Sequence, residues 1–428
     1  MDGTVINTAG EPERERRSPR ANAVEALGFA CLILATLWPF CFGLGVLGNS
    51  AAIRQAAQWP IALMMVWILL ISPWWHGDTA ESLGLGNPRR LWRTLRTAAP
   101  ARRWRLIAAI GSVLLVLNYV TVTQWPLVRR FFKLPPSALG WPEPAIVLFG
   151  VVMSALAVTC LIRYDNFPSA FRAALIVSVA LIFYAGAGAV LHRGWGAFAA
   201  FEPKRYPLDV LAYIFWGFIQ QLAFTAYFGT RLRKAFGPGP RSPHSKRPAV
   251  LGVAIASATL APTVWLLVRT LYGPAAAPLG MLAWAIVFAA PVGAVWGWFY
   301  ARDPRRLLVA TLSGLVFGLI HIDSYGLVLV TWGLGTILSW LFMEDRTRNL
   351  IALAFIHGFL GSTFGKLFGK ASAGNLRVDY RVGPWNIEEP AAYILIVPMI
   401  CLAAFLLLTV WCWRNLRPPE MMRRAAEV

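Results

Sequence analysis

Long apolar runs separated by short polar stretches dominate the pattern of this 428-residue chain. A helix needs about 20 mainly apolar residues to cross the ~30 Å hydrocarbon core of a bilayer, and the runs approach that length. We therefore predict twelve spans, at residues 27–48, 59–75, 105–124, 144–162, 173–191, 208–230, 249–270, 279–300, 306–322, 326–343, 349–367 and 390–413. The expected fold is an all-α, polytopic membrane protein.

Composition and charge agree with a membrane protein and argue against a nucleic-acid-binding one. The chain is 57% hydrophobic and only 14% charged, whereas soluble domains carry about 25% charged residues. Its net charge of +20 would suggest a nucleic-acid partner in a soluble protein. Here the basic residues cluster in short loops, where lipid headgroups and the positive-inside rule place them. We therefore expect the lipid bilayer as a partner and no nucleic acid.

The loop charges also predict the orientation of the chain. With the N-terminus in the cytoplasm, twelve spans put most of the 40 lysines and arginines in inside segments. Merging or dropping one span would move whole basic clusters, such as 89–105 and 231–247, to the outside. We expect an inner (plasma) membrane protein with both termini in the cytoplasm.

The same pattern divides the chain into four parts. They are a cytoplasmic disordered tail, a five-span region, a core region, and a last part with an outer loop, one span and a basic tail, at residues 1–24, 25–206, 207–367 and 368–428. The outer loop 368–389 is long enough to fold over the bundle as a lid. The longest inside loop, 76–104, predicts either a short amphipathic helix at the lipid interface or a solvated basic loop.

Four polar residues inside apolar spans are the candidates for chemistry. Gln220 and Gln221 fall in the middle of the sixth span, where adjacent amides need hydrogen-bond partners. His321 ends the ninth span, one turn after Phe317, and His357 lies in the middle of the eleventh. Glutamines alone would favour simple bonding between helices. Two intramembrane histidines together with a glutamine pair favour a functional polar pocket.

These residues resemble the motifs of a known family. CPBP intramembrane proteases (CAAX protease and bacteriocin-processing, also called Abi) carry EExxxR, FxxxH and HxxxN motifs. This chain has FGLIH at 317–321, HGFLG at 357–361 and an altered first motif, QQLAFT, at 220–225. The resemblance covers about 207–367. It implies a core of spans around a water-filled site, in which a glutamate activates water and the histidines position it and stabilise the oxyanion.

The resemblance makes Gln220, Gln221, His321 and His357 the candidate catalytic residues. Its departures matter physically, because glutamine cannot act as a general base. Thr225 stands where the family has arginine, so the charge that would keep a carboxylate ionised is also lost. A neutral pair thus replaces a charged pair. The final asparagine of the third motif is replaced by glycine, at 361.

Two further questions concern the register of the first motif and the missing carboxylate. Two extra spans separate the glutamines from the histidines, and residues 289–298 are an alternative register that also lacks glutamates. An even number of extra spans preserves sidedness, so the motifs can still meet. Other carboxylates that could serve are Asp209, Asp323, Glu388 and Glu389, with Asp323 preferred because it is near His321 in the chain.

Three functions fit these observations. The first is a CPBP-like endopeptidase acting on membrane proteins or on lipidated, prenyl/CAAX-type substrates. The second is an inactive relative that uses the same pocket as a binding or sorting partner. The third is a transporter, against which stand the lack of a repeat between the two halves and of a broken helix pair with a midplane carboxylate. We expect no cofactor and no metal, because no H-E-x-x-H pattern occurs.

Overall fold

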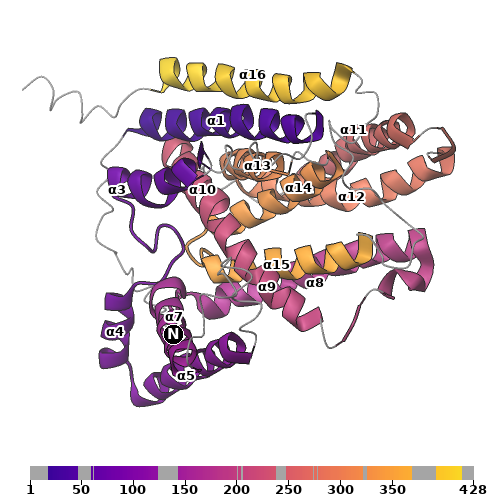
Figure 1. Ribbon diagram of the computed structural model, residues 1–428. Coiled ribbons are helices and arrows are strands. Elements are labelled where there is room, and N and C mark those ends of the chain that lie inside the picture. The colour runs from indigo at the N-terminus through magenta and orange to yellow at the C-terminus, as the bar shows by residue number, and fades with distance from the viewer. Residues whose placement is uncertain are drawn as a thin grey trace, which may run out of the picture.

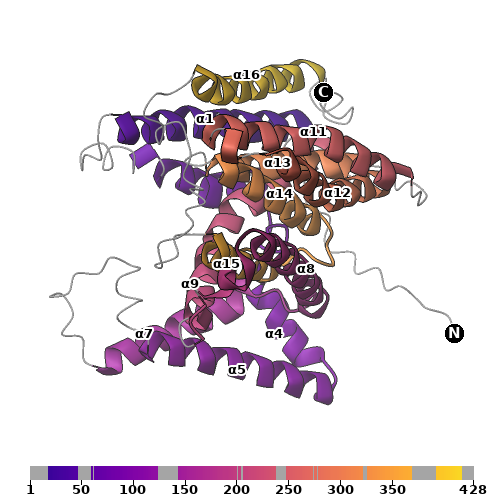
Figure 2. The ribbon, with the colours of Figure 1, turned by 90° about the vertical axis from the view of Figure 1, so that its right-hand side faces the viewer.

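The computed structural model describes residues 18–46, 59–60, 62–123, 143–199, 201–203, 206–237, 247–272, 274–276, 278–321, 325–368 and 392–416. Within these ranges all regular structure is helical (Figures 1 and 2). The all-α expectation is therefore confirmed.

The helices follow the apolar runs closely. In chain order they are α1 (Pro19–Val46), η1 (Trp67–Ile71), α3 (Ser72–His76), α4 (Pro88–Thr97), α5 (Pro100–Thr123), α7 (Glu143–Leu156), η3 (Ala157–Leu161), α8 (Phe167–Arg193), η4 (Gly194–Phe198), α9 (Tyr206–Gln220), η5 (Gln221–Ala226), α10 (Tyr227–Phe236), α11 (Arg247–Tyr272), η6 (Pro274–Ala276), α12 (Leu279–Arg302), α13 (Pro304–Leu319), α14 (Tyr325–Phe342), α15 (Leu350–Phe368) and α16 (Ala392–Asn415). Each predicted span falls on one helix or on consecutive helical segments.

Four described stretches are individually long and apolar enough to cross a membrane. They are Phe167–Leu191, Asp209–Phe236, Leu279–Arg302 and Leu350–Leu367. Together with the shorter apolar helices they fit a polytopic membrane protein. The total of twelve spans stays a prediction.

Small residues and caps set how neighbouring helices meet. Asp303 ends α12 and caps α13, because its Oδ1 accepts a hydrogen bond from the backbone N–H of Arg306 at 2.9 Å. A Cβ built on Gly252 of α11 would lie 2.1 Å from the carbonyl oxygen of Gly293 on α12. These glycines let the two backbones touch, so α11 and α12 form a close pair (Figure 1).

One long helical stretch, α9–η5–α10, joins the two main buried clusters. Tyr227, Phe228 and Leu232 of α10 pack with α1 in one cluster. Phe218 and Ala226, from α9 and η5, pack with α14 and α15 in the other. The helix that carries the glutamine pair is therefore the element around which the bundle is packed.

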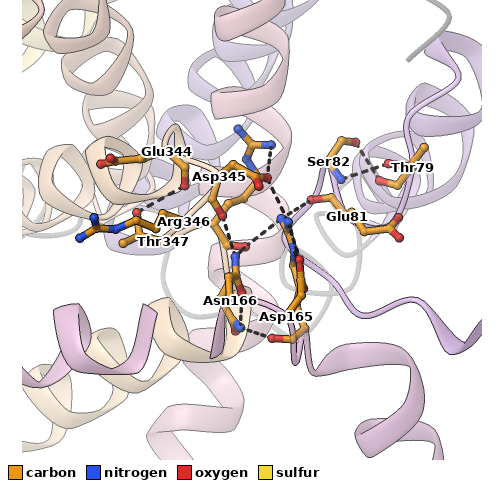
Figure 3. Close-up of polar contacts among 12 residues, drawn as sticks. Thr79, Glu81, Ser82, Asp165, Asn166, Glu344, Asp345, Arg346 and Thr347 are labelled. Carbon is orange, nitrogen blue, oxygen red and sulfur yellow. Dashed lines mark hydrogen bonds and ion pairs between the residues drawn. The ribbon is translucent and has the colours of Figure 1, made fainter. Parts of the chain in front are cut away.

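A polar network at one end of the bundle fixes three connecting segments, 77–87, 162–166 and 343–349 (Figure 3). Arg163 donates to Asp165 at 3.0 Å, to Asp345 at 3.0 Å and to the carbonyl oxygen of Glu81 at 3.3 Å. Asn166 donates to the carbonyl oxygen of Asp345 at 2.7 Å. The twelve-span prediction places all three segments in loops on the same side of the membrane. Their contact with one another is consistent with that prediction.

The structure adds detail to three expectations about the ends and loops. The expected disordered tail, 1–24, extends too far, because α1 already begins at Pro19 and Asn22 and Ala23 are buried. The 76–104 loop contains a helix, α4, and not only solvated chain. The proposed lid, 368–389, lies outside the described residues.

Candidate functional site

The glutamine pair lies at the start of a π-helical segment. Residues Gln221–Ala226 form η5, which interrupts the long helix between α9 and α10. A π turn inserts an extra residue into an α-helix and occurs frequently at functional sites. Gln221 and Thr225 on this segment are both buried. The altered first motif therefore occupies a local distortion of the central helix.

Gln221 contacts His357 directly. Its amide Nε2 lies 2.7 Å from the imidazole Nδ1 of His357, and its Oε1 accepts a hydrogen bond from the hydroxyl of Thr225. The Thr225 hydroxyl thus stands in the place of the family's arginine as the partner of the first-motif side chain. Both ends of the Gln221 amide are satisfied without any charge.

The orientation of Gln221 determines which nitrogen of His357 carries the proton. An amide NH₂ group can only donate, so Nδ1 of His357 must accept. In a neutral imidazole the proton is then on Nε2. His357 therefore presents an N–H donor on the side away from Gln221.

His321 has the opposite arrangement. It lies in the turn after α13, and its Nδ1 is 3.0 Å from the backbone carbonyl oxygen of Phe317. A carbonyl oxygen can only accept, so Nδ1 of His321 must donate. The neutral ring then carries a lone pair on Nε2, which makes His321 an acceptor where His357 is a donor.

Phe317 brings the two imidazoles together. Its ring centroid lies 5.1 Å from that of His321 and 5.4 Å from that of His357, in edge-to-face contact with both. Phe224, in η5, lies 6.3 Å from Phe317. Phe317, on α13, thus packs against η5 and α15, and its contact with His321 is the one that the one-turn spacing predicts.

Glycines allow α9 and α15 to meet closely at the site. A Cβ on Gly358 would lie 2.3 Å from the backbone nitrogen of Ile214, and a Cβ on Gly217 would lie 3.1 Å from Cγ of His357. Gly361 faces the ring of Tyr213. Gly358 therefore permits the close approach of another helix, and that helix is α9.

Gln220 differs from its neighbour. Its Oε1 is buried and has no hydrogen-bond partner among the described residues. A buried carbonyl oxygen without a partner is an acceptor that water or a substrate N–H can use. The alternative first-motif register, 289–298, lies on α12, where Gly293 packs on α11. The 220–225 register is the one that contacts a motif histidine.

The described residues place no carboxylate in contact with either histidine. Asp209 forms an ion pair with Lys366 at 2.9 Å instead. Asp323, Glu388 and Glu389 lie outside the described residues. Within the described part of the chain, no group of three or more His, Cys, Asp or Glu residues could hold a metal ion.

Sequence reasoning missed a buried charged network next to this site. Glu25 of α1 accepts hydrogen bonds from Trp67 at 3.2 Å and from Tyr227 at 2.8 Å, and it pairs with Nε2 of His76 at 2.5 Å. Arg231 of α10 lies 3.6 Å from Glu25 and also bonds Asp78. Glu25, His76 and Arg231 lie just outside the ends of predicted spans, where charged residues are ordinary and do not indicate a buried network. Their spacing along the chain carries no signal, because three separate helices bring them together.

The network holds Glu25 in its charged form. Burial raises the pKa of this carboxyl group, but hydrogen bonds from His76 and Ser72 and the charge of Arg231 outweigh burial. The pKa falls from 4.5 to about 2. Because Tyr227 and Arg231 follow η5 on the same helix, this network anchors the end of the helix that carries Gln221.

One comparison with known proteins matches the part of the chain that holds the two histidines. The family model described as type II CAAX prenyl endopeptidase Rce1-like matches residues 302–362, which include His321 and His357. No curated protein and no solved structure matches the chain. The matched segment is therefore similar to this family, and it carries both histidine motifs, at the end of α13 and on α15.

Proposed function

We propose that the protein is an intramembrane endopeptidase that cleaves membrane-associated protein substrates of the prenylated, CAAX type. The observation that carries the proposal is the opposite hydrogen bonding of the two imidazoles. His321 offers a lone pair on Nε2, and His357 offers an N–H on Nε2. Peptide hydrolysis without a metal needs one group to take a proton from water and another to stabilise the oxyanion.

In the proposed reaction His321 is the general base. Its Nε2 takes a proton from water as the oxygen attacks the scissile carbonyl carbon, so a C–O bond forms and the carbonyl oxygen becomes an oxyanion. The Nε2–H of His357 donates to that oxyanion. The C–N bond then breaks, and the leaving nitrogen receives the proton from His321.

The glutamines have positioning roles in this proposal. Gln221 holds His357 in the tautomer that donates from Nε2. The partnerless Oε1 of Gln220 accepts a hydrogen bond from the attacking water or from a substrate backbone N–H. We further propose that the protein lies in the inner membrane with both termini in the cytoplasm, as the basic loops favour.

The test is cleavage of a prenylated peptide by the purified protein in liposomes. We expect His321→Ala and His357→Ala each to abolish product formation while the variants still insert and unfold cooperatively. His244→Ala, in the basic cluster 231–247 between two predicted spans, is the matched histidine control and should cleave normally. A folded wild-type protein that binds the peptide without cleaving it would refute catalysis and support a binding or sorting role.

A further inference from the structure

One surface lies outside both the histidine site and the Rce1-like segment. It is the outward face of α4, a ten-residue helix none of whose residues is buried. Arg89, Trp92, Arg93 and Arg96 follow one another at i, i+3, i+4 and i+7, which places them in a single stripe along the helix. All four are exposed, and we refer to them as the α4 stripe.

Both ends of α4 are fixed, so the stripe has a defined position. Asn87 caps the helix by accepting from the backbone N–H of Arg89 at 3.0 Å, and its own amide donates to Glu81 at 2.6 Å. Arg90 pairs with Asp165 at 3.3 Å and so connects α4 to the network of Figure 3. At the other end Arg103 donates to the carbonyl oxygen of Arg96 at 3.0 Å.

The charge around the stripe is entirely positive. Residues 88–105 contain seven arginines and no acidic residue. The two acids that contact α4 or its cap, Glu81 and Asp165, are already engaged with Asn87 and with arginines. Within the described part of the chain, Arg89 and Arg93 have no ion-pair partner. Guanidinium groups bind phosphates well, so a stripe of guanidinium groups without ion-pair partners favours an anionic partner with several phosphates.

The position of the stripe favours lipid over a soluble anion. Figures 1 and 2 show α4 turned at a steep angle to α5, not continuing along it. The span predicted for α5 begins at residue 105, just after α4. Trp92 and Trp104 are 57% and 68% exposed. Tryptophan at the polar boundary of a bilayer, beside arginines on a helix lying across the spans, is the pattern of an interfacial helix.

We propose that the α4 stripe binds the headgroups of anionic phospholipids. The arginines contact lipid phosphates, and Trp92 lies at the level of the headgroups with the guanidinium of Arg96 over its ring, 4.6 Å from the ring centroid. Each arginine near an anionic membrane surface contributes roughly a fivefold gain in binding. Three arginines therefore give a preference of about 100-fold for anionic over zwitterionic lipid at this surface.

The test measures how tightly the full-length protein retains phosphatidylglycerol. The protein is exchanged into nanodiscs that contain phosphatidylcholine with increasing fractions of phosphatidylglycerol, and the bound lipids are counted by native mass spectrometry after release. The variant Arg89→Gln/Arg93→Gln/Arg96→Gln should lose at least tenfold in apparent affinity for phosphatidylglycerol. Trp92→Ala should lose a few-fold. All three arginines are exposed, so the variant should unfold at the wild-type temperature.

A charge-matched control separates a site from net charge. Arg241→Gln/Lys246→Gln/Arg247→Gln removes the same charge from another basic segment and should keep the wild-type affinity. An equal loss in this control would overturn the proposal, and so would unchanged lipid retention in the α4 variant. Displacement of the lipid by millimolar inorganic phosphate would also overturn it, in favour of a site for a soluble phosphate.

Discussion

The contact between Gln221 and His357 leads to a prediction with an internal control one residue away. Replacing Gln221 by leucine keeps the side-chain volume nearly constant but removes both ends of the amide. Nδ1 of His357 is then left as a buried acceptor without a partner, because Gln221 is the group that donates to it at 2.7 Å. An orphaned buried group costs about 1–3 kcal/mol. The Thr225 hydroxyl loses its acceptor as well, but it can turn to a carbonyl oxygen of its own helix.

Gln220→Leu should have the opposite effect on stability. Its buried Oε1 has no partner among the described residues, so the substitution removes an unsatisfied oxygen. The free energy of unfolding should stay the same or rise. Both variants change glutamine to leucine on adjacent residues of one helix, so they match in helix propensity and in the change of polarity.

The measurement is reversible unfolding of each variant in mixed micelles with increasing SDS, followed by tryptophan fluorescence. We expect the Gln221→Leu variant to unfold at lower SDS by about 1–3 kcal/mol, and the Gln220→Leu variant to unfold at the same or higher SDS. In the peptide assay Gln221→Leu should also lower kcat, by up to the ~10²–10³-fold seen when an oxyanion donor is removed. Equal destabilisation by the two substitutions would refute the assignment of the Gln221–His357 hydrogen bond.

Three further predictions follow from other contacts. Gly358→Ala should destabilise the protein by about 1–3 kcal/mol, because its Cβ would lie 2.3 Å from the backbone of α9. The matched Gly365→Ala, with open space around its Cβ, should be neutral or slightly stabilising in thermal unfolding. Glu25→Gln should lower the free energy of unfolding at pH 7. Because the pKa of Glu25 is lowered in the folded protein, its stabilising contribution is complete above the unfolded value and is lost on protonation. The difference in free energy of unfolding between variant and wild type should therefore shrink as the pH falls from about 4.5 towards 2. A pH-independent difference would contradict this. Nitrogen-15 NMR of histidine-labelled protein should show His321 with its proton on Nδ1 and His357 with its proton on Nε2; two identical tautomers would contradict the proposed division of roles.

The helices were predictable from the sequence because each apolar run approaches the length of a membrane-spanning helix. The predicted spans at 249–270 and 279–300 coincide with α11 and α12 to within two residues. The start of α1 was misplaced because Pro19, Arg20 and Asn22 interrupt the apolar pattern before residue 25. What makes them helical is a tertiary contact: the amide oxygen of Asn22 accepts from Arg231, more than 200 positions away.

The candidate site was partly predictable for a different reason. The one-turn spacing of Phe317 and His321 predicts their contact, and resemblance to the CPBP motifs pairs the glutamines with the histidines. Neither source predicts the π segment at Gln221–Ala226, because a π turn depends on packing and not on local residue preference. The tautomers of His321 and His357 could not be predicted from the sequence either, because they depend on which atoms of Phe317 and Gln221 face each ring.

The replacement of charged residues in the first motif has a consistent physical logic. A buried glutamate needs an opposite charge or several donors to stay ionised, so losing the arginine removes the reason to keep the carboxylate. Gln221 with Thr225 instead forms a neutral pair whose hydrogen bonds are complete. In the proposed reaction the task of taking a proton from water then passes to the imidazole of His321. A histidine base works only when it is neutral, so the rate of cleavage should fall in acid. This acid limb should disappear from whatever activity remains in a His321→Ala variant, whereas a limb that persists there would assign the base to another residue.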